Sequence, residues 1–165
     1  QIIFKSVYIN FIPELLHSNT DQFVYEQKEK ILVRKTGNIL MASLDSEQYY
    51  TDQSLYNLYL KPNKWYSNKV LLAILNSKLL NYYYNKKLIT NADVFPYIKG
   101  VHLKMFPLPH LSDRIESELS NLVDSIIQHK KQNIDTSVIC NKIDALVYQL
   151  YGLTDAEIKI IEQSI

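Results

Sequence analysis

Arg34 and Lys35 are the residues of this chain whose type and position best suit a chemical task. They end a short apolar run and stand directly before the turn-forming tripeptide Thr36-Gly37-Asn38. A guanidinium and an ammonium neutralise phosphates, and the small polar groups of the turn can hydrogen-bond to a base edge. This combination indicates a surface that binds a polyanion and distinguishes its bases.

Further cations and polar side chains surround this turn in the sequence. We predict that phosphates are contacted by Lys30, Lys35, Lys64 and Lys99. We predict base contacts from Arg34, Thr36, Asn38, Asn57 and the loop 49–54, which contains Tyr50, Thr51, Gln53 and Ser54. Two alternatives stay open: the lysines can form an ordinary solvated face, and residues 49–54 a plain turn with surface tyrosines.

Motifs for catalysis are missing from the sequence. It contains no Gly-rich phosphate loop, no paired-His zinc signature and no serine elbow, and its four histidines have no ligand spacing. The single cysteine, Cys140, excludes an intramolecular disulfide and a cysteine-rich zinc site, and we expect it to be buried and inert. We therefore predict a non-catalytic chain with no catalytic residue, no metal site and no cofactor of its own.

The charge is distributed unevenly along the chain. Residues 1–110 carry 13 Lys/Arg and 8 Asp/Glu, a net +5, whereas residues 111–165 carry 5 and 9, a net −4. The overall net charge of +1 hides this difference. Such asymmetry suggests that the first part meets an anionic partner and the second part something else.

Length and composition indicate a globular protein. With 165 residues, 47% apolar and 21% charged, the chain suits one ordinary domain, or one core with a helical appendage. No apolar run approaches the roughly 18 residues that span a membrane, and no secretory leader opens the sequence. Because the chain begins with Gln, we expect it to be part of a longer, cytoplasmic protein without a membrane partner.

The elements that must position the candidate residues can be read from periodicity. The β-branched and aliphatic runs 30–34 and 39–44 predict strands around the turn, and strand-like sequence recurs at 1–12, 49–51 and 55–60. Ser67 or Asn68 can cap a helix that runs to about Tyr84. Residues 86–100 suggest an irregular loop, and residues 101–106 an extended segment.

The pattern changes from strand-like to helical after the linker between Pro107 and Pro109. Helices are predicted over about 112–131 and 136–151, and the first has Ser112 as its cap. Gly152 suits a helix end, and the sequence Thr154-Asp-Ala-Glu157 forms a capping box for a last helix. We therefore predict an α+β fold: a small mixed-sheet recognition domain with a packed helix (1–109), then an antiparallel helical hairpin (110–165) as a spacer or docking region.

Taken together, these segments resemble a known family. It comprises the C-terminal target-recognition (specificity) domains of Type IIG restriction–modification enzymes and related adenine-specific DNA methyltransferases, with similar domains in Type I specificity subunits. The resemblance covers nearly the whole chain from about residue 23. It is carried by the order of residues 30–38, 50–57, 71–79, 95–100, 106–109 and 143–153.

The resemblance implies that the chain binds double-stranded DNA in the major groove and selects the site to be modified. An upstream methyltransferase domain of the same parent chain would then hold S-adenosylmethionine and perform the chemistry. Two other hypotheses remain: a protein-interaction module that docks onto a larger enzyme without touching DNA, and single-strand binding by stacked tyrosines.

Overall fold

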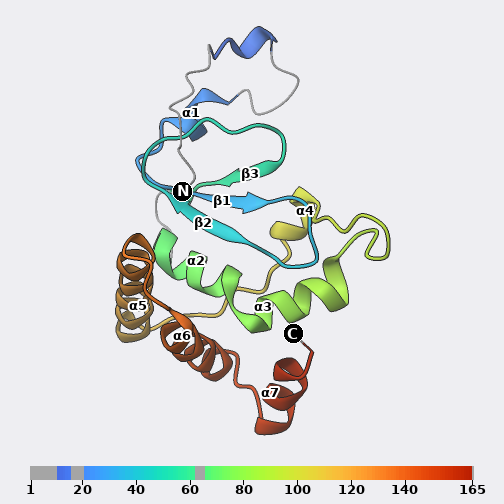
Figure 1. The fold of residues 1–165 in the computed structure, drawn as a ribbon, viewed down its shortest axis with the longest axis vertical. Coiled ribbons are helices and arrows are strands. Elements are labelled where there is room, and N and C mark those ends of the chain that lie inside the picture. The colour runs from blue at the N-terminus through green and yellow to red at the C-terminus, as the bar shows by residue number, and fades with distance from the viewer. Residues whose placement is uncertain (1–10, 16–20, 62–65, 165) are drawn as a thin grey trace.

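The computed structural model describes residues 11–15, 21–61 and 66–164, so the expected strand-like start at residues 1–10 lies outside the described part. An antiparallel three-stranded sheet, in the order β2-β1-β3, packs against helices and confirms the α+β class (Figure 1). Strand β1 covers Lys30–Arg34, β2 Ala42–Asp45 and β3 Leu55–Leu58. Strand β1 thus has the predicted bounds, β2 and β3 are shorter than predicted, and residues 49–51 form no strand.

The central strand β1 sets the layout of the sheet. Its side chains Ile31 and Val33 are completely buried in the hydrophobic core, as expected for the inner face of a strand. Both neighbours run antiparallel to it, so Lys30 pairs with Asp45 at one end and Arg34 with Leu55 at the other. The connection from β2 to β3 must therefore run the length of the sheet.

Two short helices cover the sheet in place of the predicted single helix. Helix α2 spans Asn68–Asn76 and α3 spans Lys78–Tyr83. The prediction of one continuous helix was wrong because Ser77 adopts an extended conformation, with ψ of 154°, and its hydroxyl accepts the Leu80 amide as the cap of α3. A π-helical turn, Tyr84–Leu88, follows α3.

The predicted extended segment 101–106 was also wrong. Its first residues form the helical turn α4, Gly100–Leu103. The amide of His102 donates to the Lys99 carbonyl at 2.9 Å, and that of Met105 to the His102 carbonyl at 3.0 Å. These local bonds satisfy the backbone without a neighbouring strand. Short helical turns also occur at Pro13–Leu15 and at α1, Gln22–Tyr25.

The C-terminal helices agree closely with the predicted ones. They are α5 (Asp113–Lys131), α6 (Ser137–Leu150) and α7 (Asp155–Glu162). Gly152 has φ of +65°, and the Thr154–Glu157 capping box is present. Cys140 on α6, however, is exposed, so the expectation of a buried thiol was wrong. None of the helices in the described part of the chain could cross a membrane.

One hydrophobic core links the sheet to the C-terminal helices. It contains Ile31 and Ile74 from the first part of the chain and Leu119 and Val147 from the second. Helix α5 packs on α2, and α6 on α5, below the sheet in Figure 1. The proposed division at residues 109 and 110 stays a prediction, and the core continues across it.

A buried ion pair lies at the far end of the sheet from Arg34. The Lys30 ammonium is 2.5 Å from the Asp45 carboxylate, and both side chains are at most 1% exposed. The Tyr25 ring lies beside the ammonium, 5.7 Å from it to the ring centroid. The same carboxylate accepts the amides of Glu47 and Tyr49 at 2.9 and 3.0 Å, so it also shapes the start of the β2–β3 connection.

Removing the cation should leave a buried, unpaired carboxylate. We expect Lys30→Met to lower the free energy of unfolding by about 3–5 kcal/mol in a urea titration. Lys28→Met removes an exposed lysine two residues away and should change it by less than about 0.5 kcal/mol. The double variant Lys30→Met/Asp45→Asn should recover part of the loss. Equal stability of the Lys30 and Lys28 variants would contradict a structural role for the pair.

Candidate nucleic-acid interface

Three segments meet where strand β1 ends. The Lys35 amide donates to the Ser54 carbonyl at 3.0 Å, and the Ile98 amide to the Lys35 carbonyl at 2.9 Å. The Gly37 amide donates to the Pro96 carbonyl at 2.8 Å. We call these segments, residues 34–41, 52–54 and 90–99, the rim. Backbone hydrogen bonds thus join parts of the chain that are distant in sequence into one surface.

The Arg34 side chain folds back over the turn that follows it. Its Nη2 donates to the Ile39 carbonyl at 3.4 Å. A Cβ at Gly37 would lie 2.7 Å from this nitrogen, and Gly37 has φ of +119°, so both space and backbone conformation favour glycine there. Nε is buried and has no hydrogen-bond partner among the described residues. Arg34 therefore supports the turn and retains a donor.

The half-buried Lys35 is placed by an aromatic ring. Its ammonium lies 4.5 Å from the centroid of Tyr56, a cation–π contact. Asp52 is close enough for the lysine to contribute to its lowered pKa, although hydrogen bonds from Ser54 are the main cause. The Tyr56 hydroxyl donates to the Ile98 carbonyl at 3.3 Å. The positive charge of Lys35 is thus held at the rim and is partly neutralised by the Asp52 carboxylate.

Three polar side chains of the helices hold the β1–β2 connection from behind. The Tyr84 hydroxyl donates to the Gly37 carbonyl at 2.7 Å. The Leu40 amide donates to Asn81 Oδ1 at 2.8 Å, and Asn76 binds both the amide and the carbonyl of Ala42 at 2.9 Å.

Between these anchors, the side chains that face solvent are Asn38, Ile39 and Met41. Sequence reasoning missed the anchoring role of the helix. The available signal was the presence of asparagines within a strongly apolar helical stretch, because buried amides need partners.

Part of the predicted recognition loop faces inward. Tyr50 stacks on Tyr25 with a centroid distance of 4.5 Å. The Tyr25 hydroxyl donates to the Thr51 carbonyl at 3.1 Å, and Asn57 Nδ2 donates to Thr51 Oγ1 at 2.7 Å. These contacts pack the middle of the loop against α1 and β3. Gln53 is exposed.

The predicted cations separate into different groups. Lys30 is buried against Asp45, so its ammonium has a structural partner and no route to a phosphate in this structure. Lys64 lies outside the described residues. Lys99 is exposed, directly before α4. The predicted residues that the structure brings together at the rim are Arg34, Lys35, Thr36, Asn38, Gln53, Ser54 and Lys99.

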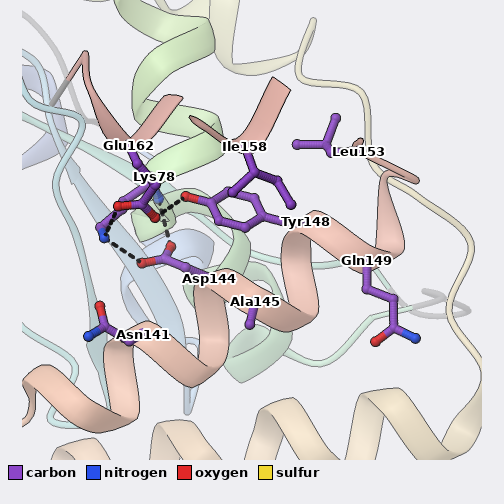
Figure 2. Close-up of a pocket in the computed structure, with 9 residues that line it drawn as sticks. All are labelled: Lys78, Asn141, Asp144, Ala145, Tyr148, Gln149, Leu153, Ile158 and Glu162. Carbon is purple, nitrogen blue, oxygen red and sulfur yellow. Dashed lines mark hydrogen bonds and ion pairs between the residues drawn. The ribbon is translucent and has the colours of Figure 1, made fainter. Parts of the chain in front are cut away.

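A cavity of about 650 Å³ lies elsewhere, between the start of α3 and helices α6 and α7 (Figure 2). Lys78 pairs with Glu162 at 2.7 Å and lies 4.0 Å from Asp144, and the Tyr148 hydroxyl donates to Glu162 at 2.8 Å. The Lys78 hydrogen bond lowers the pKa of Glu162, whereas burial raises that of Asp144. With two carboxylates against one lysine, this joint fastens helices together and does not suit phosphate.

Metal binding has no support in the geometry: the described residues contain no group of three or more His, Cys, Asp or Glu side chains that could hold a metal ion. The arrangement at the rim instead combines fixed backbone, cations and exposed amides. Such a surface can bind and discriminate a charged polymer.

Comparison with known proteins gives two matches. Residues 1–108 match the family model of the TaqI-like C-terminal specificity domain. A protein of Methanocaldococcus jannaschii, named as a candidate type II restriction enzyme and methyltransferase, is 30% identical over 152 residues. The match covers 86% of this chain and 13% of that relative, so the chain spans only a small part of the relative's length.

The rim should loosen when one of its anchors is removed. We expect Asn81→Leu to leave the Leu40 amide buried without a partner and to cost about 1–3 kcal/mol of unfolding free energy. Hydrogen exchange at Leu40 should accelerate. Asn85→Leu, at the next turn of the helical segment but exposed, is the matched control. Unchanged Leu40 exchange in Asn81→Leu would show that the amide does not anchor the loop.

The joint around Lys78 gives a pH-dependent prediction. We expect Lys78→Met to raise the pKa of both Glu162 and Asp144, as followed by carboxyl NMR titration. The lowered pKa of Glu162 stabilises the fold above its unfolded-state pKa, and this contribution is lost as pH falls through the folded-state value. The raised pKa of Asp144 acts oppositely: its contribution is present at low pH and lost as pH rises.

The stability deficit of Lys78→Met should therefore be largest above the folded-state pKa values of both carboxyls and should shrink as pH falls through them. Lys69→Met, which removes the pair with Asp124, serves as the control and should leave the pKa of Glu162 unchanged. A pH-independent deficit in Lys78→Met would refute this account of the joint.

Proposed function

The chain belongs to the family of TaqI-like C-terminal specificity domains, and from this membership we propose that it binds double-stranded DNA and selects its sequence. The name of the Methanocaldococcus jannaschii relative supports a parent that combines restriction and methylation. The site chosen by this chain would then be the one at which a linked adenine-specific methyltransferase acts. The observation that carries the proposal is the rim, in which backbone hydrogen bonds hold Arg34, Lys35 and Lys99 on one surface.

Rigid presentation is what a reading surface requires. The connection 37–42 is held at Gly37, Leu40 and Ala42 by side chains of the helices, so little backbone freedom remains to be lost on binding. The β1–β2 connection would enter the major groove of B-DNA, which is wide enough to admit an α-helix or a two-stranded ribbon. The exposed Asn38 amide can match the hydrogen-bonding edge of adenine, and the Arg34 guanidinium that of guanine.

The cations at the rim would fix the position of the duplex. Lys99 is exposed beside the turn, and Lys35 is oriented by Tyr56. Phosphate contacts supply affinity and register but carry no sequence information directly. In this arrangement the lysines position the DNA and the turn reads it.

The parent protein would supply the chemistry. We propose that S-adenosylmethionine is held by an upstream methyltransferase domain and that this chain is non-catalytic. The acidic helices α5 to α7 would serve as spacer or docking elements, since their net negative charge disfavours phosphate. The cytoplasmic location expected from the sequence stays a prediction.

Two substitutions separate positioning from reading. Lys99→Ala should reduce the slope of log affinity against log salt by about 0.9, because one phosphate contact is lost. Asn38→Ala should leave that slope unchanged. It should reduce the difference in binding free energy between the preferred base pair and the others at one position by about 1–3 kcal/mol. Both effects can be measured by fluorescence anisotropy on duplexes selected from a random library.

Lys159→Ala removes an exposed lysine on α7 and serves as the control for Lys99. If no duplex is retained at low salt, or if both lysine variants change the slope equally, the rim is not a DNA surface. Retention of a partner protein in place of DNA would favour the interaction module instead.

A further inference from the structure

The loop between the π-helical turn and α4 is closed at its base, where Thr90 pairs with Tyr97. Its tip, Val94 and Phe95, is apolar. Thr90 and Tyr97 exchange two backbone hydrogen bonds of 3.0 Å. The amides of Val94 and Phe95 both donate to the Asn91 carbonyl, at 3.3 and 3.1 Å. The backbone is therefore held in shape, yet Val94 is 82% exposed and Phe95 60% exposed. Two adjacent, large apolar side chains thus face solvent on a defined loop.

The loop is attached directly to the rim. The Gly37 amide donates to the carbonyl of Pro96, the residue after Phe95, and Thr36 bridges to Tyr97. In Figure 1 the loop projects outward beyond the end of the sheet and the last turn of α3. A duplex seated on the Thr36–Asn38 turn would therefore lie within reach of the apolar tip.

The charges of the stretch that contains this loop favour a polyanion over a protein partner. Residues 84–104 contain four lysines and a single carboxylate, Asp93. The lysines are all exposed: Lys86, Lys87, Lys99 and Lys104. Duplex DNA offers the matching arrangement, with phosphates on the outside and an apolar base stack within.

We infer that Val94 and Phe95 form a wedge that enters the base stack of the duplex bound at the rim. The inference rests on the proposed function and adds to it a deformation of the DNA. An apolar side chain inserted at a base step replaces part of the lost stacking and kinks the duplex. The lysines that flank the loop in sequence would hold the phosphates on either side of the opened step.

This wedge would also influence which sites are chosen. Pyrimidine–purine steps unstack most easily, so a site with such a step under the tip would bind more tightly without any direct base contact. An opened step also lowers the cost of extruding a neighbouring base, which an enzyme that modifies bases must do. Selectivity would thus have two sources, hydrogen bonding at the turn and deformability under the loop.

The test uses a duplex selected from a random library, with 2-aminopurine placed at each position in turn. Binding is followed by anisotropy and unstacking by 2-aminopurine fluorescence. We expect a fluorescence rise at one or two adjacent positions, lost in Phe95→Ala together with roughly tenfold in affinity. Phe95→Leu, which keeps an apolar body, should retain much of the rise. Phe23→Ala, at an exposed phenylalanine of α1, is the matched control.

The outcomes distinguish the wedge from the proposed function. No selected duplex at all would overturn DNA recognition itself. Salt-dependent binding without a fluorescence rise would overturn the wedge alone. The same conclusion would follow if Phe95→Ala left both the fluorescence rise and the affinity unchanged. In either case the exposed Val94 and Phe95 would be assigned to a contact with a protein. Circular dichroism melts confirm that each variant is folded before the comparison is made.

Discussion

The buried ion pair between Lys30 and Asp45 is the interaction on which the rest of the sheet depends. A slip of one residue between β1 and β2 would turn Lys30 toward the apolar core and leave Asp45 without its cation, so the pair penalises every other register. Asp45 also accepts the amides of Glu47 and Tyr49, which directs the β2–β3 connection along the sheet. That connection delivers Ser54 to Lys35, where the rim begins.

A second constraint comes from the helices behind the sheet. The break at Ser77 divides one apolar segment into α2 and α3, and both helices offer polar side chains to the same stretch of backbone. Asn76, Asn81 and Tyr84 satisfy backbone groups that face the protein and leave the opposite side of the stretch to solvent. Loops placed on a rigid scaffold in this way are the usual position for binding residues. The same helical segment thus contributes to the hydrophobic core and holds the candidate interface in place.

Charge is separated in the fold as it is in the sequence. Residues 1–110 carry a net positive charge, whereas carboxylates predominate on α5 to α7. Near α7, Lys78 neutralises part of this negative charge and ties the terminal helix to α3. The excess of positive charge in the first part of the chain and of negative charge in the second thus coexist without an extreme net charge.

The sequence by itself determined those features that depend only on residues a few positions apart. The Ser112 cap, the left-handed Gly152 and the Thr154–Glu157 capping box could be read directly, since a cap acts on backbone groups of its own turn. The α+β class, the charge asymmetry and the family resemblance could likewise be read from the sequence.

Only the tertiary structure decided which polar groups are buried. Lys30 and Thr51 read as surface residues, but Asp45 and Tyr25 lie opposite them once the sheet forms. Conversely, Cys140 stands among apolar neighbours in sequence but is exposed. Burial depends on which distant segments pack together, and no local pattern contains that information.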